Sequence, residues 1–533
     1  MKSIASLLSI IALGLGLLSC SGSGGGGGGV GGTPAFAVSP TAADFGVVGN
    51  TYTSTLAATG GTAPFTWPLG GGLPAGLSLD AGTGVVSGMP TAAGNFPATF
   101  TVMDSTGMTA TGSVLFSIHT RTDRVSVDSS GTAGSGASST PSINGDGSLV
   151  AFVSQATNFV AGVIGSQIYV HNRQTNQIEV VSRDSNTTVV NEGNGVSSAP
   201  AMSNDGRFVA FVSQSTNLVT GVSGQQVYLR DRQAGTTTLV SKDNLGNAGN
   251  GASSAPAISS DGSFITFVSL ATNLVTGVSG QQIYILDRVA ATITLISKDN
   301  SPVPVPGNGA STTPVVSSTG RFIAFASLAT NLGALGGSQQ IYVRDRLTGV
   351  NGTTSLVSKD SIATAGNGNS ATPSISGDGQ FVVFMSLATN LVTGASGQQI
   401  YLQDRNTGVN GTNSLVSHDN NGVPVQGNGA NSVPSISSNG QVVAFVSLAT
   451  NLLNPAPAVA GQQIYSFDRL AGANGTTSLA SKDNSVIPVA GSGASDRPSA
   501  NSNGSFVAFS SSATNLATAP PAAPSDIYVR ALP

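Results

Sequence analysis

The stretch that decides the fold runs from Pro200 to Asp243 and reads PAMSNDGRFVAFVSQSTNLVTGVSGQQVYLRDRQAGTTTLVSKD. It recurs with drift along the chain, and each copy opens on a proline, at Pro141, Pro200, Pro256, Pro314, Pro373, Pro434 and Pro498. The interval between copies is about sixty residues, and a fixed period of this length is typical of repeat architectures. One copy is therefore expected to be one structural unit.

Each copy contains four segments that its residue pattern predicts to be strands. In the copy at Pro200, the first ends at Asp205-Gly206, a pair that fits a tight hairpin in which both central residues take positive φ. The second, residues 208–212, is apolar without alternation, so both of its faces are expected to be buried. The third covers residues 226–231, and the fourth is predicted at residues 239–243.

A four-stranded unit with such a central strand must be stacked between like units. Radial stacking gives a β-propeller, which leaves only short edges. The pattern Ser-x-Asp-Gly-x-x-Val-Ala-Phe, followed by Ile-Tyr-x-x-Asp, resembles the repeats of TolB-like propellers. The resemblance implies a propeller, although TolB itself has six such blades and this chain has seven copies.

The two ends of the repeat region complement each other. The last copy stops after its third strand, in the run from Asp526 to Ala531. A spare fourth strand, Arg-Val-Ser-Val-Asp at residues 124–128, precedes the first proline and matches residues 239–243. The sequence thus predicts an all-β fold with a seven-bladed β-propeller over residues 120–533, closed by its N-terminal strand (velcro closure). A linear solenoid, the alternative, would not need this exchange.

Residues 35–119 have short strand-like runs between Gly and Pro turns. The run from Leu73 to Gly107, with Pro64-Phe65-Thr66-Trp67 before it, resembles a family of Ig-like, cadherin-related domains of bacterial surface proteins. The resemblance implies a small β-sandwich with a core aromatic, and some such domains bind calcium. Candidate ligands here are Asp80 and Asp104, but no carboxylate cluster supplies the six or more oxygens that calcium prefers. A spacer or adhesion module and a calcium-dependent adhesion module both stay open.

The first residues are predicted to be a secretory signal, since Lys2 precedes an apolar run from Ile4 to Leu18. Leu17-Leu18-Ser19-Cys20 resembles the lipobox of bacterial lipoproteins, which implies cleavage after residue 19 and acylation of Cys20. Ser21 favours the outer membrane by the same resemblance, and residues 21–34 are a Gly/Ser-rich tether. The alternative is an ordinary cleaved signal that leaves a free thiol.

Composition narrows the possible partners. Charged residues make up 8% of the chain, against about 25% in an average soluble domain, and the net charge is −4. Without basic clusters, nucleic acid is a poor partner. The expected partners are the membrane, through the lipid anchor, and an unidentified envelope protein or glycan. No cofactor is expected apart from the calcium considered above.

The loops from the fourth to the first strand and from the second to the third strand are long and share one end of the sheets, so they form the default binding face. Thr-Asn recurs there in every copy, which favours a structural role. His119, His171 and His418 are interpreted as isolated surface substitutions. Since no carboxylate pair recurs and no G-x-S-x-G elbow is present, the chain is predicted not to be an enzyme.

The sequence therefore predicts a non-enzymatic lipoprotein of the cell envelope that binds a protein or a glycan through the long-loop face. One alternative is calcium-dependent adhesion through the cadherin-like domain. Another is a hydrolase or lyase with its site in the propeller channel.

Overall fold

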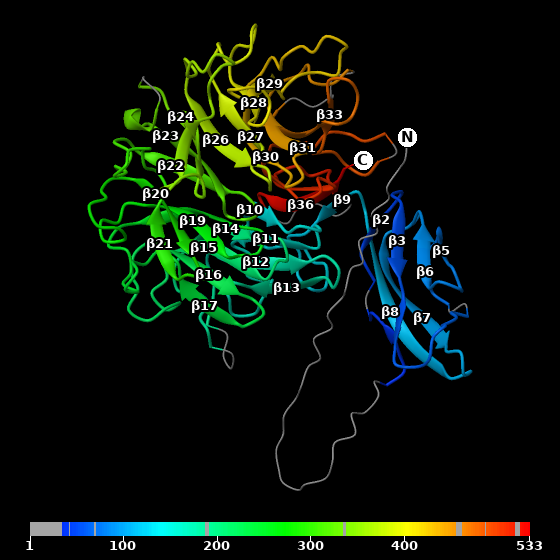
Figure 1. Cartoon of the computed structure of the whole chain (residues 1–533). Helices are drawn as coiled ribbons and strands as arrows, with labels where there is room; N and C mark the ends of the chain where they lie inside the picture. Colours follow the sequence, from blue (N-terminus) through cyan, green and yellow to red (C-terminus); the bar gives the residue numbers. More distant parts are fainter. Residues whose placement is uncertain are drawn as a thin grey trace.

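The computed structural model describes residues 35–41, 43–68, 71–186, 191–333, 337–454, 461–485, 487–517 and 523–532. Within these ranges the protein is built of strands, with one short 3-10 helix, η1 (Thr330–Leu332). Figure 1 shows a large ring of sheets with a smaller sandwich beside it. No helix in the described ranges is long and apolar enough to cross a membrane.

The smaller unit is an Ig-like β-sandwich. Its sheets are β1-β4, β2-β8-β7 and β3-β6-β5, with β2 parallel to β8. Trp67 is 2% exposed and lies in the core with Phe100 and Phe116, so the expected core aromatic is confirmed. The strands are β1 (Ala37–Ser39), β2 (Gly46–Val47), β3 (Tyr52–Thr55), β4 (Ala57–Thr59), β5 (Leu77–Leu79), β6 (Val85–Gly88), β7 (Gly94–Met103) and β8 (Thr109–His119).

The ring consists of seven four-stranded antiparallel sheets in the described residues. The first three are β10 (Ser138–Ile143), β11 (Leu149–Ser154), β12 (Gln167–Asn172), β13 (Gln177–Val180); β14 (Ser197–Met202), β15 (Phe208–Ser213), β16 (Gln226–Asp231), β17 (Thr236–Leu239); and β18 (Ser253–Ile258), β19 (Phe264–Ser269), β20 (Gln282–Asp287), β21 (Thr292–Leu295). The next three are β22 (Ser311–Val316), β23 (Phe322–Ser327), β24 (Gln340–Asp345), β25 (Thr353–Leu356); β26 (Ser370–Ile375), β27 (Phe381–Ser386), β28 (Gln399–Asp404), β29 (Thr412–Leu415); and β30 (Asn431–Ile436), β31 (Val442–Ser447), β32 (Gln463–Asp468), β33 (Thr476–Leu479).

The seventh sheet combines the two ends of the repeat region. Its strands are β34 (Ser495–Ala500), β35 (Phe506–Ser511), β36 (Asp526–Ala531) and β9 (Thr122–Arg124). β9 pairs antiparallel with β36, and Arg124 lies opposite Tyr528. A hydrophobic cluster that contains Phe152 of the first sheet and Val529 of the seventh joins the two sheets. The all-β fold of a propeller with an N-terminal Ig-like domain is confirmed.

The apolar second strands supply the cores on both sides of each sheet. In β15, Val209 and Phe211 point into a cluster shared with the first sheet, whereas Phe208, Ala210 and Val212 point into one shared with the third. Successive side chains of a strand point to opposite faces, so an unbroken apolar run packs against both neighbours. This explains why the strand does not alternate in sequence.

The first strand of every sheet is bulged at the residue before its proline. In β14, Ala199 has φ of 51° and the register with β15 shifts between Ser198 and Ala201. The same residue has φ of 45° to 53° in the other sheets, at Thr140, Ala255, Thr313, Thr372, Val433 and Arg497. This backbone region is costly for β-branched residues and disfavoured before proline, so packing of the inner strands holds it in place.

The hairpin turns differ from the prediction. Only Gly206 has positive φ, at 71°, and Asp205 does not. The Asp205 carboxylate instead caps the turn, since its Oδ1 accepts from the N–H of Arg207 at 3.0 Å and from Ser203 Oγ. A turn stabilised in this way keeps aspartate on the negative side of φ.

The fourth strand also ends earlier than expected, at Leu239 instead of Asp243. Ser241 leaves the strand to satisfy buried polar groups. Its Oγ accepts from the N–H of Val227 at 3.0 Å and donates to Gln226 Oε1 at 2.6 Å. Gln226 Nε2 then donates to the carbonyl of Gly249 at 2.8 Å. The recurring Val-Ser-x-Asp is thus the anchor of the loop that follows the strand, because buried polar groups require partners.

Candidate functional site

A belt of backbone hydrogen bonds surrounds one end of the central channel. In each sheet, one N–H just after the first strand donates to a carbonyl of the next sheet at 2.8 to 3.2 Å. The donors are Gly145, Asn204, Ser260, Ser318, Gly377, Asn439 and Ser502, and Ser502 donates back to Gly145 of the first sheet. Gly, Ser and Asn at this place are small enough to let seven backbones approach closely, so the belt narrows the channel.

This end of the channel has a pocket of about 120 Å³. Glycine, serine, asparagine and aliphatic side chains line it, among them Gly145, Asn204, Ser260 and Ile143. A hydrolase or lyase with a site in the channel would therefore have to draw its acid–base groups from the opposite, long-loop end.

On the loop face, the recurring Thr-Asn pair joins two loops of each sheet. Asn273 Oδ1 accepts from the N–H of Asn250 at 2.9 Å, and Asn273 Nδ2 donates to the carbonyl of Ala248 at 2.9 Å. Asn250 in turn binds both the N–H and the hydroxyl of Thr272. These contacts give the repeated asparagine a structural role. Its side chain bonds the backbone of a second loop, whereas the sequence predicted bonds within its own turn.

The position after each second strand differs between sheets and lies at the inner rim of the loop face. The N–H of Leu270 donates to the carbonyl of Ala252, directly before the innermost strand β18. The equivalent residues of four consecutive sheets are Leu270, Leu328, Leu387 and Leu448, all 45% to 50% exposed. The other three sheets have the exposed polar residues Gln155, Gln214 and Ser512. We call the four leucines the leucine arc.

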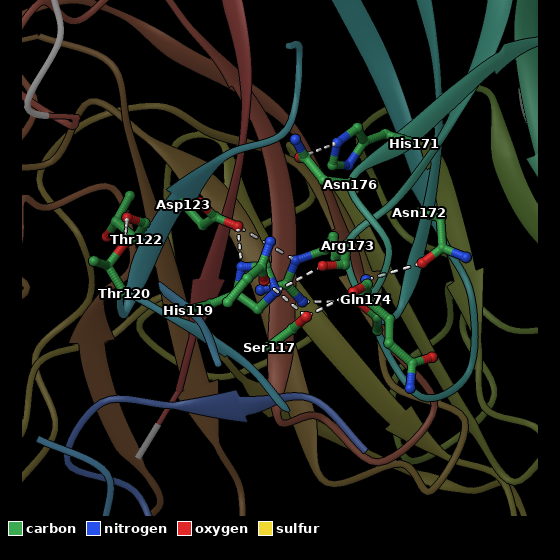
Figure 2. Close-up of polar contacts among 12 residues, drawn as sticks. Ser117, His119, Thr120, Thr122, Asp123, His171, Asn172, Arg173, Gln174 and Asn176 are labelled. Atoms are coloured by element: carbon green, nitrogen blue, oxygen red, sulfur yellow. Dashed lines mark hydrogen bonds and ion pairs between the residues drawn. The ribbon is translucent and has the colours of Figure 1, made fainter. Parts of the chain in front are cut away.

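A polar cluster joins the Ig-like domain to the ring, and Figure 2 shows its members pointing toward one another. His119, the last residue of β8, has Nδ1 2.8 Å from Asp123 Oδ2 and Nε2 2.8 Å from the carbonyl of Arg173. Both ring nitrogens therefore face oxygen atoms. Ser117 Oγ donates to the carbonyl of Gln174 at 2.6 Å, which adds a second tie between the domains.

Arg173 is the centre of this junction. Its guanidinium carbon lies 4.8 Å from the ring centroid of Phe45 in the Ig-like domain and 5.0 Å from that of Phe506 in the seventh sheet, and these two rings also contact each other, with centroids 5.3 Å apart. Burial acts to raise the pKa of Asp123, but His119 and Arg173 outweigh it and hold that pKa below its usual range. The Ig-like domain thus covers the seam at which the ring closes.

The interpretation of the histidines as isolated surface substitutions was wrong. His171 and His418 are buried, and burial lowers the pKa of His171 to about 4. His119 and His171 both lie near Asp123, although 52 residues separate them. No sequence pattern predicts this cluster, because it forms only when the Ig-like domain packs on the first sheet.

Asp80 and Asp104 cap turns of the Ig-like domain. Asp80 Oδ1 accepts from the N–H of Gly82 and of Thr83 at 2.9 and 3.0 Å. Asp104 accepts from the N–H groups of Thr62 and Met108, both at 3.0 Å. Across the described ranges, no three His, Cys, Asp or Glu side chains are grouped to hold a metal ion. Cys20 lies outside the described residues.

The fold and these surfaces define a β-propeller protein with an Ig-like domain on its ring-closing seam. The model of the family described as "Putative Ig domain" matches residues 34–120. No curated protein matches the sequence significantly.

Several solved structures are similar in fold. The β-propeller domain of the trilobed protease from Pyrococcus furiosus has 11% identity and a TM-score of 0.44, covering 74% of this chain and 92% of that one. A TolB-type protein from Agrobacterium tumefaciens has 17% identity and a TM-score of 0.36, covering 70% of this chain and 100% of that one. The periplasmic gluconolactonase PpgL from Pseudomonas aeruginosa has 13% identity and a TM-score of 0.34, covering 70% of this chain and 97% of that one.

These likenesses correct the prediction that the chain is not an enzyme. Similar propellers occur in a protease and in a gluconolactonase, so absence of a sequence motif on this fold does not exclude catalysis. At such identities the likeness is one of fold, and it assigns no reaction to this chain.

Proposed function

We propose that the chain is a protein-binding scaffold whose partner docks on the loop face over the leucine arc. The arc carries the proposal, because four adjacent sheets expose leucine at a position where the other three have polar residues. In a ring of near-identical units, a feature limited to one sector is not needed for the architecture. Glycan sites rely on aromatic stacking surfaces, whereas this face offers aliphatic ones, so a protein partner is favoured over a glycan.

The arc contributes a measurable share of the affinity. Full burial of a leucine side chain is worth about 1.5–3 kcal/mol, so covering a half-exposed one adds about 1 kcal/mol. Four leucines give about 4 kcal/mol, which corresponds to roughly a thousandfold in affinity.

The test replaces the four leucines by the residue that the chain itself uses at this position, as Leu270→Gln, Leu328→Gln, Leu387→Gln and Leu448→Gln. A photocrosslinking residue at position 387 should capture a partner in the native host, and the fourfold variant should bind that partner about a thousandfold more weakly. Exposed Leu347 and Leu470, which lie in turns of the opposite face, are matched controls. Equal loss from Leu347→Gln with Leu470→Gln, or no loss from the arc variant, would refute the proposal.

We further propose that Cys20 is acylated and anchors the protein in the cell envelope, as the lipobox-like Leu17-Leu18-Ser19-Cys20 supports. Metabolic labelling with a palmitate analogue should mark the protein, and Cys20→Ala should abolish the label. A labelled Cys20→Ala variant would contradict acylation at this residue.

A further inference from the structure

Arginine side chains fill the seams between neighbouring sheets on the turn face of the ring. The guanidinium carbon of Arg288, in the third sheet, lies 4.0 Å from the ring centroid of Phe208 in the second. Its Nη1 donates to the carbonyl of Gly262 in its own hairpin turn at 2.7 Å. Four more seams have such a pair, at 3.8 to 5.0 Å: Arg173 over Phe506, Arg346 over Phe264, Arg405 over Phe322 and Arg469 over Phe381.

Four of these guanidinium groups also lie near a carboxylate at the end of the third strand of the preceding sheet. Burial lowers the pKa of Arg469, and the charge of Asp404 acts in the opposite direction. The same two effects act on Arg288 with Asp231, Arg346 with Asp287 and Arg405 with Asp345. Such a seam offers a guanidinium both an aromatic face and a negative charge.

The seam between the sixth and seventh sheets has neither the arginine nor the phenylalanine. Leu532 occupies the position of the arginine. Its N–H donates to the carbonyl of Ser505 at 2.8 Å, and in the third sheet the N–H of Arg288 donates to the equivalent carbonyl, that of Ser263, at 2.9 Å. Val442 opens the second strand where most other sheets have phenylalanine. Both replacements are smaller than the groups that fill the other seams.

The result is a pocket of about 220 Å³ in this seam. Its wall includes apolar side chains, hydroxyl side chains and one carboxylate, among them Val442, Leu532, Ser466, Thr476, Ser478 and Asp468. Asp468 accepts from Gln441 Nε2 at 3.1 Å on each oxygen and from the N–H of Leu470 at 2.9 Å on Oδ1, and none of the ion pairs in the described ranges includes it. Pockets for drug-sized ligands have roughly 300–1,000 Å³, so this one suits a single small group.

We propose that this pocket binds a guanidinium group supplied from outside the chain, at the place that arginine occupies in the other seams. The planar group carries five N–H donors, which the Asp468 carboxylate and the hydroxyl oxygens of the wall can accept. Its alkyl stem packs against Val442 and Leu532. The pocket is on the face opposite the leucine arc, so this site is independent of the proposed function.

The test uses ethylguanidinium as the probe and ethylurea as its neutral analogue, with binding to the full chain followed by saturation-transfer NMR. Ethylguanidinium should bind saturably at millimolar concentrations, and ethylurea at least about tenfold more weakly. Leu532→Arg fills the pocket from within and should abolish probe binding while the protein melts at the same or a higher temperature. Asp468→Asn should weaken binding about tenfold or more. No saturable binding, equal binding of ethylurea, or unchanged binding by Leu532→Arg would each overturn the proposal.

A variant in the neighbouring seam tests whether a guanidinium from solution can replace a native arginine side chain. Arg469→Leu removes the native guanidinium between the fifth and sixth sheets and should lower the melting temperature. Ethylguanidinium should restore part of that loss, and ethylurea should not. If ethylguanidinium restores nothing, a seam of this kind does not take a guanidinium from solution and the proposal fails. A short peptide with a central arginine, compared with ethylguanidinium, distinguishes a protein side chain from a free cation as the source of the group.

Discussion

A buried ion pair at the ring closure gives the sharpest prediction about stability. Six sheets have glutamine at the start of the third strand, and the seventh has Asp526. Asp526 Oδ1 accepts from Ser126 Oγ at 2.8 Å, and Oδ2 lies 3.2 Å from Arg124 Nε. The side chain of Asp526 is 0% exposed and that of Arg124 is 7% exposed. Asp526→Gln restores the residue of the other sheets but removes the carboxylate that faces Arg124.

The size of the effect follows from this burial. Breaking a buried ion pair from one side costs about 3–5 kcal/mol. Unfolding entropy is about 2.1 cal/mol/K per residue, so a ring of about 410 residues changes by about 0.9 kcal/mol per degree near its melting temperature. Asp526→Gln should therefore lower the melting temperature by about 3–6 °C.

A second substitution supplies the control. Arg124 pairs with Tyr528 as Leu239 pairs with Tyr228, so Arg124→Leu together with Asp526→Gln reproduces the pattern of the second sheet. Replacing a buried pair by apolar groups is neutral or stabilising by about 1–4 kcal/mol, so the double variant should melt at or above the wild-type temperature. Scanning calorimetry of the three proteins decides the matter. A single variant that melts like the wild type, or a double variant less stable than the single one, would refute the reasoning.

Three further predictions concern the same architecture. Burial raises the pKa of Asp526 above 3.8, so the folded state holds this proton more tightly than the unfolded state does. The stabilisation from this proton is complete below pH 3.8 and is lost as the pH rises through the folded-state pKa. Relative to the Arg124→Leu/Asp526→Gln variant, the melting temperature of the wild type should therefore fall as the pH is raised from 3.8 towards neutrality. Phe45→Ala removes one of the two rings that contact the Arg173 guanidinium, so trypsin should cleave after the exposed Arg121 faster than in the wild type. Unchanged cleavage would show that the junction does not depend on this ring. Asn273→Ala removes two hydrogen bonds across the loop face and should cost about 1–2 kcal/mol in urea unfolding, and a cost near zero would contradict the structural role of the repeated asparagine.

The sequence was sufficient for the architecture because the relevant signals are local and repeated. An unbroken apolar second strand such as β15 can be stable only between two like sheets, and this requirement holds in every copy. The recurring asparagine at 273 was correctly interpreted as structural, although its partner loop was not identified. The fourth strand was predicted at residues 239–243 and lies earlier, at Thr236–Leu239, because Val240 and Ser241 have the residue types of a strand but bond to the start of the third strand.

Other features depend on contacts between copies and between domains, which no single repeat encodes. The residue before each proline has positive φ against its local preference, because the inner strands pack tightly around the channel. His119 and Arg173 meet only when the Ig-like domain covers the ring-closing seam. Asp468 can be identified as part of a pocket only because Leu532, 64 residues further along the chain, lies beside it. Five other seams have an arginine stacked on a phenylalanine at this place. The sequence by itself determined the repeat, the sheets and their radial stacking, since these follow from short-range patterns of apolar residues. Only the tertiary structure decided which side chains meet across each seam, because those contacts join residues that lie about one repeat or more apart.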